Sequence, residues 1–390
     1  MWPIRGRRYD TGEPVTIWIS GDVIAAIEPA TPSGRIADWP YLAPGLFDLQ
    51  INGHGGTWFG KSDLSVEDVV RTLEPHFRCG ITRLFPTLIT ASFETFLGGF
   101  TAIRKACEQV RWVDQMVPGC HLEGPYISHE DGPRGAHPLS QVRGCNWEEF
   151  CRLNEASGDR IKLVTLAPEA DGAVEFIQRA VASKITIAIG HTAASSEQLQ
   201  AAIEAGATLS THLGNGAHGM LKRHPNYIWE QLGDSRLTAS IITDGHHLPP
   251  SVIRSVIRTK TPARVVITCD AAGLAGCPPG IYRIESGEVE VLETGKIVLA
   301  GQPQLLAGSG LTTDVCVAHA MDVAGVSLRE ACDMAGRVPS RLVGIEEITL
   351  RRGSRADLVL FHHAGRGSRF EIIATIAAGA PKFGAVPDLS

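Results

Sequence analysis

Residues 43–56 read APGLFDLQINGHGG: a Pro-Gly turn, a short apolar run and then three polar residues at alternate positions, Gln50, Asn52 and His54. Side chains two residues apart on a strand point to the same face, so these three polar groups would project into one space. Two interpretations are open. Either the strand leaves the core here and becomes solvated, or it carries polar groups into a site inside the fold.

The rest of the chain repeats a strand-helix rhythm into which this segment fits. Short runs rich in Val, Ile, Leu and Thr alternate with longer stretches of helical period, the pattern of βαβ units around a parallel sheet. Eight strands are predicted, at residues 41–50, 82–87, 117–122, 162–166, 186–190, 208–212, 237–243 and 264–268. Helices between them are predicted at residues 65–77, 92–110, 173–182 and 195–205.

Eight such units over about 250 residues indicate an α/β fold of the TIM (β/α)8 barrel type, in which the chemistry lies at the carboxyl ends of the strands. A doubly wound sheet is disfavoured, because no Gly-x-Gly-x-x-Gly fingerprint follows the first strand.

The two ends of the chain have a different pattern. PVTIWISGDVIAAIEP, residues 14–29, reads as two short strands joined by a Gly-Asp turn, which predicts a hairpin. Near the other end, RADLVLFHH and EIIATIAAGAP also read as strands. Isolated hairpins are marginally stable, so pairing of the two ends would stabilise both. We therefore predict a small β-sandwich domain made of residues 1–42 and 348–390, attached to a barrel of residues 43–347.

The composition is that of an ordinary soluble globular protein, with 44% hydrophobic and 20% charged residues. A net charge of -6 without a basic stripe argues against nucleic acid as a partner. No run of 18 apolar residues occurs, and the first residues, MWPIRGRRYD, lack the apolar core of a secretory signal. We expect no membrane partner and a cytoplasmic location. The 9 cysteines contain no CxxC pair and do not indicate a disulfide framework.

Four ionisable residues stand at the carboxyl ends of predicted strands. Glu123 follows the third strand, His191 the fifth, His212 the sixth and Asp270 the eighth. Any one of them could be a satisfied polar residue at a strand end. Together at one rim of a barrel, a carboxylate and two imidazoles favour a site for a borderline metal such as zinc, which leaves a position open for water when it is catalytic.

A series of motifs then runs in one order along almost the whole chain: APGLFDLQINGHGG, HLEGPYI, PRGAHP, GHTAAS, THLGN, TDGHHL, TCDAAGLAG, LAGSGLT and RRGSRADLVLF. In this combination the chain resembles the N-acetylglucosamine-6-phosphate deacetylase family of the amidohydrolase superfamily. The resemblance implies a hydrolase that removes acetate from an N-acetylated amino-sugar phosphate, with N-acetylglucosamine 6-phosphate as the first candidate. A different N-acyl or cyclic amide substrate and a catalytically silent sugar-binding relative stay open as alternatives.

The resemblance also implies roles for individual residues. Glu123, His191 and His212 match the family's metal ligands. Asp270 matches the catalytic aspartate, the general base that activates water, and His137 matches the histidine that contacts the substrate and helps to polarise the acetyl carbonyl. The positions that match recognition of the sugar phosphate are Asn215, Gly216, Arg223 and His247. One divalent metal ion per chain is implied, zinc first with iron(II) and others possible, and so is a homodimer.

The departures from the family pattern lie on the substrate side. After THL the family commonly has Tyr-Asn-Ala-Met, whereas this chain has GNGAHGM, which loses an aromatic ring and gains His218. His218 is either a solvated loop residue or a new contributor to the site. Hydrolysis of an N-acyl group is therefore better supported than the identity of the sugar.

Many amidohydrolases place a His-x-His pair at the end of the first strand, where it binds a second metal ion. Those positions are Gln50 and Asn52 in this chain. Neutral amides are poor ligands for a borderline cation beside imidazole, so we expect one metal ion, with the amides hydrogen-bonded around it. The alternative is that His54, in the Gly-rich loop past the strand, replaces a lost ligand.

Overall fold

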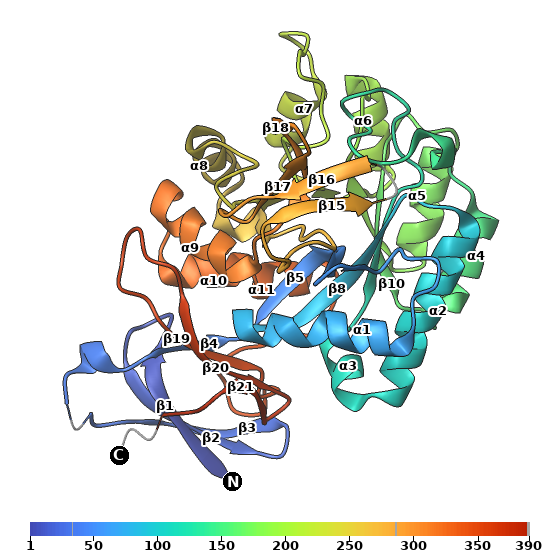
Figure 1. Ribbon diagram of the computed structural model, residues 1–390. Helices are drawn as coiled ribbons and strands as arrows, with labels where there is room; N and C mark the ends of the chain where they lie inside the picture. The colour runs from blue at the N-terminus through green and yellow to red at the C-terminus, as the bar shows by residue number, and fades with distance from the viewer. Residues whose placement is uncertain (33, 285–286, 388–390) are drawn as a thin grey trace.

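The computed structural model describes residues 1–32, 34–284 and 287–387 and contains a barrel of eight parallel strands (Figure 1). Neighbouring strands follow chain order: β5 (Leu46–Ile51), β8 (Ile81–Ile89), β9 (Cys120–Glu123), β10 (Ile161–Leu166), β11 (Thr186–Ile189), β12 (Leu209–Ser210), β13 (Thr238–Ile242) and β14 (Val265–Thr268). The last and first strands meet at a parallel bridge between Ile51 and Ala271. The predicted TIM barrel is confirmed, and each of the eight predicted strands overlaps an observed one.

Helices cover the outside of the barrel, each with one face buried against it. They are α1 (Val66–Leu73), α2 (Phe93–Gln109), α3 (Arg111–Met116), α4 (Trp147–Ala156), α5 (Ala173–Ala182), α6 (Ser196–Glu204), α7 (Tyr227–Gly233), α8 (Pro250–Lys260), α9 (Thr313–Ala324), α10 (Leu328–Met334) and α11 (Arg337–Leu342). Ser65 and Ser195 start α1 and α6 with capping boxes, which satisfy the free N–H groups of the first turn. No helix in the described part of the chain has the length and apolar composition needed to cross a membrane.

Both ends of the chain contribute to one seven-stranded sheet below the barrel, in the order β21-β20-β19-β4-β1-β2-β3. Its strands are β1 (Trp2–Arg8), β2 (Pro14–Ser20), β3 (Val23–Pro29), β4 (Tyr41–Pro44), β19 (Leu358–His362), β20 (Glu371–Ala377) and β21 (Ala380–Gly384). Strand β4 joins the two halves, because it pairs with β1 on one side and with β19 on the other. The predicted pairing of the two termini is confirmed, while the division into domains at residues 42 and 348 stays a prediction.

The predicted start of the first barrel strand at residue 41 is wrong. Tyr41–Pro44 belongs to the terminal sheet, and the chain changes sheets at Gly45. The Gly45 N–H donates to Asp357 O beside the terminal sheet, and the next N–H, of Leu46, donates to Gly80 O beside the barrel, both over 2.9 Å. A β-carbon at position 45 would lie 2.2 Å from Thr82 Oγ1, so only glycine fits at this crossing.

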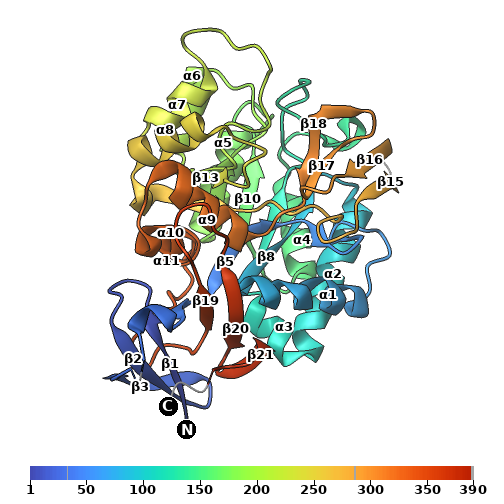
Figure 2. The same ribbon diagram turned by 60° about the vertical axis from the view of Figure 1, so that its left-hand side comes forward.

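A four-stranded antiparallel sheet between β14 and α9 was not predicted. It consists of β15 (Gly280–Ile284), β16 (Gly287–Val291), β17 (Lys296–Leu299) and β18 (Gln302–Ser309). Figure 2 shows it projecting from the barrel on the side of α1 and α2. The chain returns to the rim through a parallel bridge between Ser309 and Ala271. The alternating pattern of GEVEV, residues 287–291, is the sequence signal that identifies such a strand.

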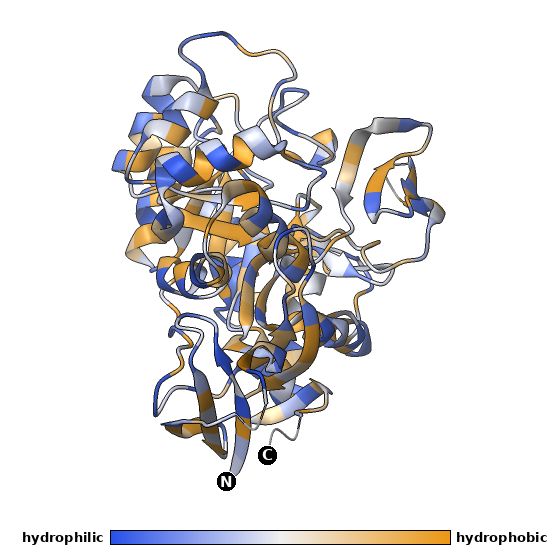
Figure 3. Cartoon of the chain, turned by 90° about the vertical axis from the view of Figure 1, so that its left-hand side faces the viewer, coloured by the Kyte–Doolittle hydropathy of each residue, from blue (hydrophilic) through white to orange (hydrophobic). Residues whose placement is uncertain are grey.

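The barrel strands are largely hydrophobic and the outer helix faces largely polar (Figure 3), yet β5 carries a fully buried carboxylate, Asp48. Asp48 Oδ1 accepts hydrogen bonds from Thr268 Oγ1 over 2.5 Å and from the Gln50 N–H over 2.9 Å. Its Oδ2 accepts from the Cys269 N–H over 2.9 Å and from Thr313 Oγ1 over 2.6 Å. A buried charge is tolerated only when it is hydrogen-bonded in this way. Asp48 therefore ties the first barrel strand to the last and to the start of α9.

Replacing Asp48 with Ala would leave two hydroxyls and two backbone N–H groups without their acceptor. We expect the free energy of unfolding to fall by about 3–5 kcal/mol, measured by urea unfolding at 25 °C. Asp48→Asn keeps the shape but turns an NH2 group toward one pair of donors, so the free energy of unfolding should fall less than in Asp48→Ala. A change of less than about 1 kcal/mol in Asp48→Ala would contradict this role.

Candidate metal centre and active site

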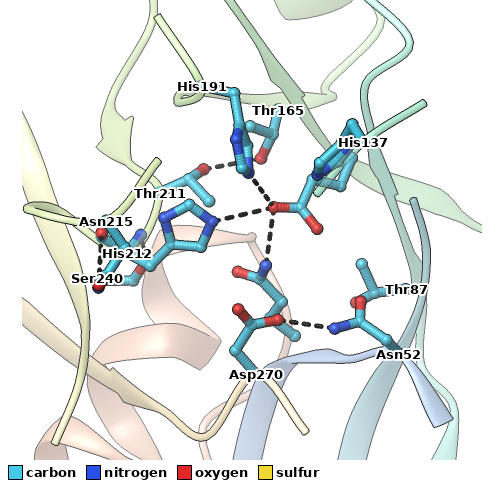
Figure 4. Close-up of polar contacts among 12 residues, drawn as sticks. Asn52, Thr87, His137, Thr165, His191, Thr211, His212, Asn215, Ser240 and Asp270 are labelled. Carbon is cyan, nitrogen blue, oxygen red and sulfur yellow. Dashed lines mark hydrogen bonds and ion pairs between the residues drawn. The ribbon is translucent and has the colours of Figure 1, made fainter. Parts of the chain in front are cut away.

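The three predicted metal ligands meet at the carboxyl rim of the barrel, where Figure 4 labels His191 and His212. Glu123 is the last residue of β9, His191 follows β11 and His212 follows β12. The Nε2 atoms of His191 and His212 lie 3.1 and 3.0 Å from the same oxygen, Glu123 Oε1. One ligand atom from each residue lies within 4.8 Å of the others, and all three residues are buried.

This cluster fits a divalent cation. His191 Nδ1 donates to Pro133 O over 2.8 Å, which leaves the lone pair on Nε2, the atom that faces Glu123. Burial opposes ionisation of Glu123, but its contacts with His191 and His212 outweigh that effect and keep the pKa of Glu123 well below its usual range. One carboxylate oxygen and two imidazole nitrogens are a donor set that zinc and similar cations accept. The cluster therefore supports a divalent metal centre.

The backbone turns sharply at the residues that end these strands. His191, His212 and Asp270 have φ angles of 50°, 29° and 51°. Side chains with a β-carbon rarely adopt this left-handed region, which costs about 1–3 kcal/mol per residue and occurs preferentially at functional sites. The surrounding packing thus fixes the direction of three side chains at the rim.

The two amides of the first strand contact the two carboxylates of the site. Gln50 Nε2 donates to Glu123 Oε1 over 2.9 Å, and Asn52 Nδ2 donates to Asp270 Oδ1 over 2.7 Å. Both amide residues are buried, so the interpretation of this strand end as solvated is wrong. Burial and the negative charge of Glu123 raise the pKa of Asp270 to about 6.

The alternation of residues predicts that His54 projects into the same space as Gln50 and Asn52. This prediction is wrong. The His54 ring packs edge-on against the ring of His76, with 5.1 Å between centroids. The strand β5 ends at Ile51, and the chain then enters the hairpin of β6 (Gly53–His54) and β7 (Thr57–Trp58), so the period of two stops before His54. Among the described residues, His54 is not part of the metal-ligand cluster.

His137 lies over the cluster, at the end of the loop of residues 128–137. Its ring centroid is 4.3 Å from that of His191, and its Nδ1 is 2.7 Å from Thr90 Oγ1. Burial, reinforced by the neighbouring His191, lowers the pKa of His137 to about 3. The ring is therefore neutral near pH 7, and Nε2 is the nitrogen that a substrate could reach.

Two of the residues matched to sugar-phosphate recognition lie beside the metal ligands. Gly216 packs against His191, where a β-carbon would lie 2.7 Å from Nδ1, so a larger residue would displace the ring. Asn215 Nδ2 donates to His212 O over 3.3 Å. The loop of residues 214–217 thus contacts the metal site directly.

The other two lie on different loops. His247 Nδ1 is 2.8 Å from Oδ2 of Asp244, a buried carboxylate whose Oδ1 accepts from the His247 N–H over 3.0 Å. The sequence analysis missed Asp244, although its place directly after the seventh predicted strand was a usable signal. Arg223 is exposed on the loop of residues 218–226, which projects above α7 in Figure 1, and is not brought to the cluster.

His218 is not a free loop residue. It joins two loops above the site, residues 128–137 and residues 214–226. The Tyr227 hydroxyl oxygen accepts the His218 N–H over 2.8 Å and donates its own proton to His218 Nδ1 over 3.0 Å. His218 Nε2 is then the protonated nitrogen, and it donates to Glu130 Oε2 over 3.0 Å. A β-carbon at Gly132 would lie 3.0 Å from His218 Cα, so the loops also pack closely. We call Glu130, His218 and Tyr227 the loop clasp.

Comparison with curated proteins yields relatives that match over most of the chain. An N-acetylgalactosamine-6-phosphate deacetylase of Escherichia coli O157:H7 is 33% identical over 344 residues, which are 87% of this chain and 89% of that protein. An N-acetylglucosamine-6-phosphate deacetylase of Mus musculus is 33% identical over 332 residues, 82% of this chain and 79% of that protein. The chain belongs to the N-acetylglucosamine-6-phosphate deacetylase family of the amidohydrolase superfamily. No protein-family model matches the sequence.

Solved structures of this deacetylase family have the same fold along nearly the whole chain. The crystal structure of the enzyme from Mycobacterium smegmatis matches with a TM-score of 0.83 and 31% identity, covering 94% of this chain and 95% of that one. The enzyme from Pasteurella multocida matches with a TM-score of 0.84 and 26% identity, covering 96% and 97%. The predicted resemblance is confirmed, and the protein is a hydrolase of the amidohydrolase superfamily.

The geometry predicts one tightly bound divalent metal ion per chain, because amides occupy the positions of the His-x-His pair. Elemental analysis of the purified protein should give about one equivalent, and His191→Ala or His212→Ala should weaken metal binding at least tenfold, about 1.4 kcal/mol. His54→Ala is the matched control and should keep the full equivalent. Two tightly bound equivalents, or loss of metal in His54→Ala, would contradict the assignment.

The loop clasp predicts that His218→Ala frees the two loops above the site. The exchange of amide hydrogens in residues 128–137 and 214–221 should become about fivefold faster, the effect of losing about 1 kcal/mol of partly exposed hydrogen bonds. His224→Ala removes an exposed histidine from the same projecting loop and should leave these rates unchanged. Equal exchange in both variants would show that the clasp does not join the loops.

Proposed function

We propose that the protein removes the acetyl group from an N-acetylated hexosamine 6-phosphate, first of all N-acetylglucosamine 6-phosphate, to give acetate and the amino-sugar phosphate. The observation that carries this proposal is the buried cluster of Glu123, His191 and His212 beside Asp270. The relatives supply the substrate class, since they are named for N-acetylglucosamine 6-phosphate and for N-acetylgalactosamine 6-phosphate.

Glu123, His191 and His212 would hold the metal ion, and we take zinc as the first candidate, with iron(II) as the alternative. A divalent cation, when bound, acidifies water and polarises a carbonyl oxygen. Gln50 supports this arrangement, because its amide holds the Glu123 oxygen that also faces the two imidazoles.

Asp270 is the general base in this proposal. It takes a proton from water as the water oxygen attacks the acetyl carbon, and it delivers that proton to the nitrogen as the C–N bond breaks. The hydrogen bond from Asn52 to Oδ1 orients the carboxylate and leaves Oδ2 for the water. One carboxylate can serve both steps because it ends the cycle ionised, as it began.

His137 is placed to stabilise the negative charge that develops on the acetyl oxygen. The neutral ring can accept the Thr90 hydroxyl proton at Nδ1 and donate from Nε2. A donor of this kind is typically worth a few kcal/mol in the transition state, about 3–4 in measured cases.

We assign the sugar phosphate to Arg223 and His247, with the backbone amides near Asn215 and Gly216 holding the same group. A guanidinium suits phosphate because its fork presents two parallel donors. We also propose a homodimer, in which the exposed loop that carries Arg223 and Met220 would meet the partner subunit. A cytoplasmic location is part of the same proposal.

Acetate release from N-acetylglucosamine 6-phosphate, N-acetylgalactosamine 6-phosphate and their unphosphorylated forms tests the substrate class. We expect a kcat/KM at least about tenfold higher for a phosphorylated sugar, and Arg223→Ala should abolish that preference, since a hydrogen bond to a charged group contributes about 1.5–3 kcal/mol. Equal turnover with and without phosphate would contradict the role of Arg223 and favour another N-acyl substrate.

Asp270→Asn tests the base. The amide keeps the shape but cannot take a proton, so kcat should fall by about 10³-fold while the metal content stays unchanged. In the wild type, kcat/KM should decrease as the pH falls through the pKa of Asp270, because only the ionised carboxylate accepts a proton. A cation lowers that pKa below the value of about 6 that it has without one, so the acid limb should lie below pH 6. Full activity of Asp270→Asn would rule out the mechanism.

A further inference from the structure

A cavity of about 440 Å³ lies on the outer side of the barrel, away from the metal cluster. It is open to solvent and is bordered by α8, by the carboxyl end of α9 and by the loop between β19 and β20, which rises beside α9 at the left of Figure 1 and faces the viewer in Figure 3. None of its lining residues belongs to the metal cluster or to the two loops above it.

Three arginines line this cavity, Arg254 and Arg258 from α8 and Arg366 from the loop. Arg254 is anchored, because its Nη1 donates to Val323 O over 3.2 Å. Arg258 and Arg366 are exposed, and within residues 1–32, 34–284 and 287–387 no carboxylate forms an ion pair with either. Two of the three guanidinium groups at the cavity, those of Arg258 and Arg366, therefore have no carboxylate partner among the described residues.

Among the described residues, Asp322 is the carboxylate that lines the cavity, and it has a structural role. Its Oδ1 accepts the N–H of Gly367 over 2.9 Å and so fixes the turn that carries Arg366. Three guanidinium groups against one carboxylate leave an excess of positive charge, and like charges in a concave site attract an anion from solution.

We propose that this cavity is a second anion site that binds a phosphate monoester of a small metabolite. Guanidinium forks bind phosphate oxygens in pairs, which suits a dianionic phosphate better than a single carboxylate. The volume falls within the range of about 300–1,000 Å³ typical of small-molecule sites and exceeds what phosphate alone requires. Apolar side chains such as Met321 and Val326 provide a wall for the remainder of the ligand.

The competing role for these arginines is purely structural, since cations near the carboxyl end of a helix such as α9 stabilise it. The two roles differ in what they predict for binding. Arginines that only cap a helix need no ligand. An anion site must bind an anion, and it must lose that binding when Arg258 and Arg366 are replaced.

Calorimetric titration of the intact, metal-loaded protein with glucose 6-phosphate tests the proposal, with glucose as the uncharged comparison. Arg258→Ala/Arg366→Ala should lose one equivalent of glucose 6-phosphate binding relative to the wild type. Arg351→Ala/Arg352→Ala removes two exposed arginines elsewhere and should keep it. The same stoichiometry in Arg258→Ala/Arg366→Ala as in the wild type, or no binding by the wild type, would overturn the proposal.

Arg366→Gln alone provides a second test that places no demand on the stability of a double variant. It should raise the Kd of glucose 6-phosphate at this cavity about tenfold, and an unchanged Kd would overturn the proposal. Acetate release by Arg258→Ala/Arg366→Ala should stay within about twofold of the wild type, because none of these residues contacts the metal cluster. Failure of the proposed deacetylase reaction would appear as absence of acetate release in every variant and is therefore distinguishable.

Discussion

The site depends on the contacts that the buried carboxylate of Glu123 makes with the residues around it. One of its oxygens faces nitrogen atoms from three other strand ends, Gln50 Nε2 at 2.9 Å, His191 Nε2 at 3.1 Å and His212 Nε2 at 3.0 Å. A buried carboxylate is costly unless such partners or a cation compensate it. Only a closed ring of parallel strands brings four strand ends to one point, so the barrel and the metal centre are parts of one arrangement.

Strand β5 organises the interior of the barrel along its length. Its inward residues are Asp48 and Gln50, Asn52 follows directly after the strand, and each of the three has a different partner. Asp48 binds the last strand and the start of α9, Gln50 binds Glu123, and Asn52 binds Asp270. The first strand therefore positions both the proposed metal ligand and the proposed base by hydrogen bonds, without contributing a metal ligand.

The metal side and the substrate side of the site are built differently. The metal ligands lie at strand ends in a rigid framework, with strained backbone angles that the packing maintains. The residues matched to the sugar and its phosphate lie on loops that hydrogen bonds such as the loop clasp hold together. Loops tolerate change better than strands, which agrees with relatives named for two different amino-sugar phosphates on one framework.

The sequence by itself determined the barrel, because alternation of apolar runs and helical periods depends on local spacing, and it determined which residues stand at the strand ends. It also determined that four of these residues belong to one site, since parallel strands end at one rim of the barrel. They are Glu123, His191, His212 and Asp270. Only the tertiary structure decided which groups satisfy the buried carboxylate of Asp48 and that His54 turns away from Gln50 and Asn52. That outcome depends on where β5 ends and on the donors that β14 and α9 bring to Asp48, and contacts between distant segments leave no periodic signal in the sequence.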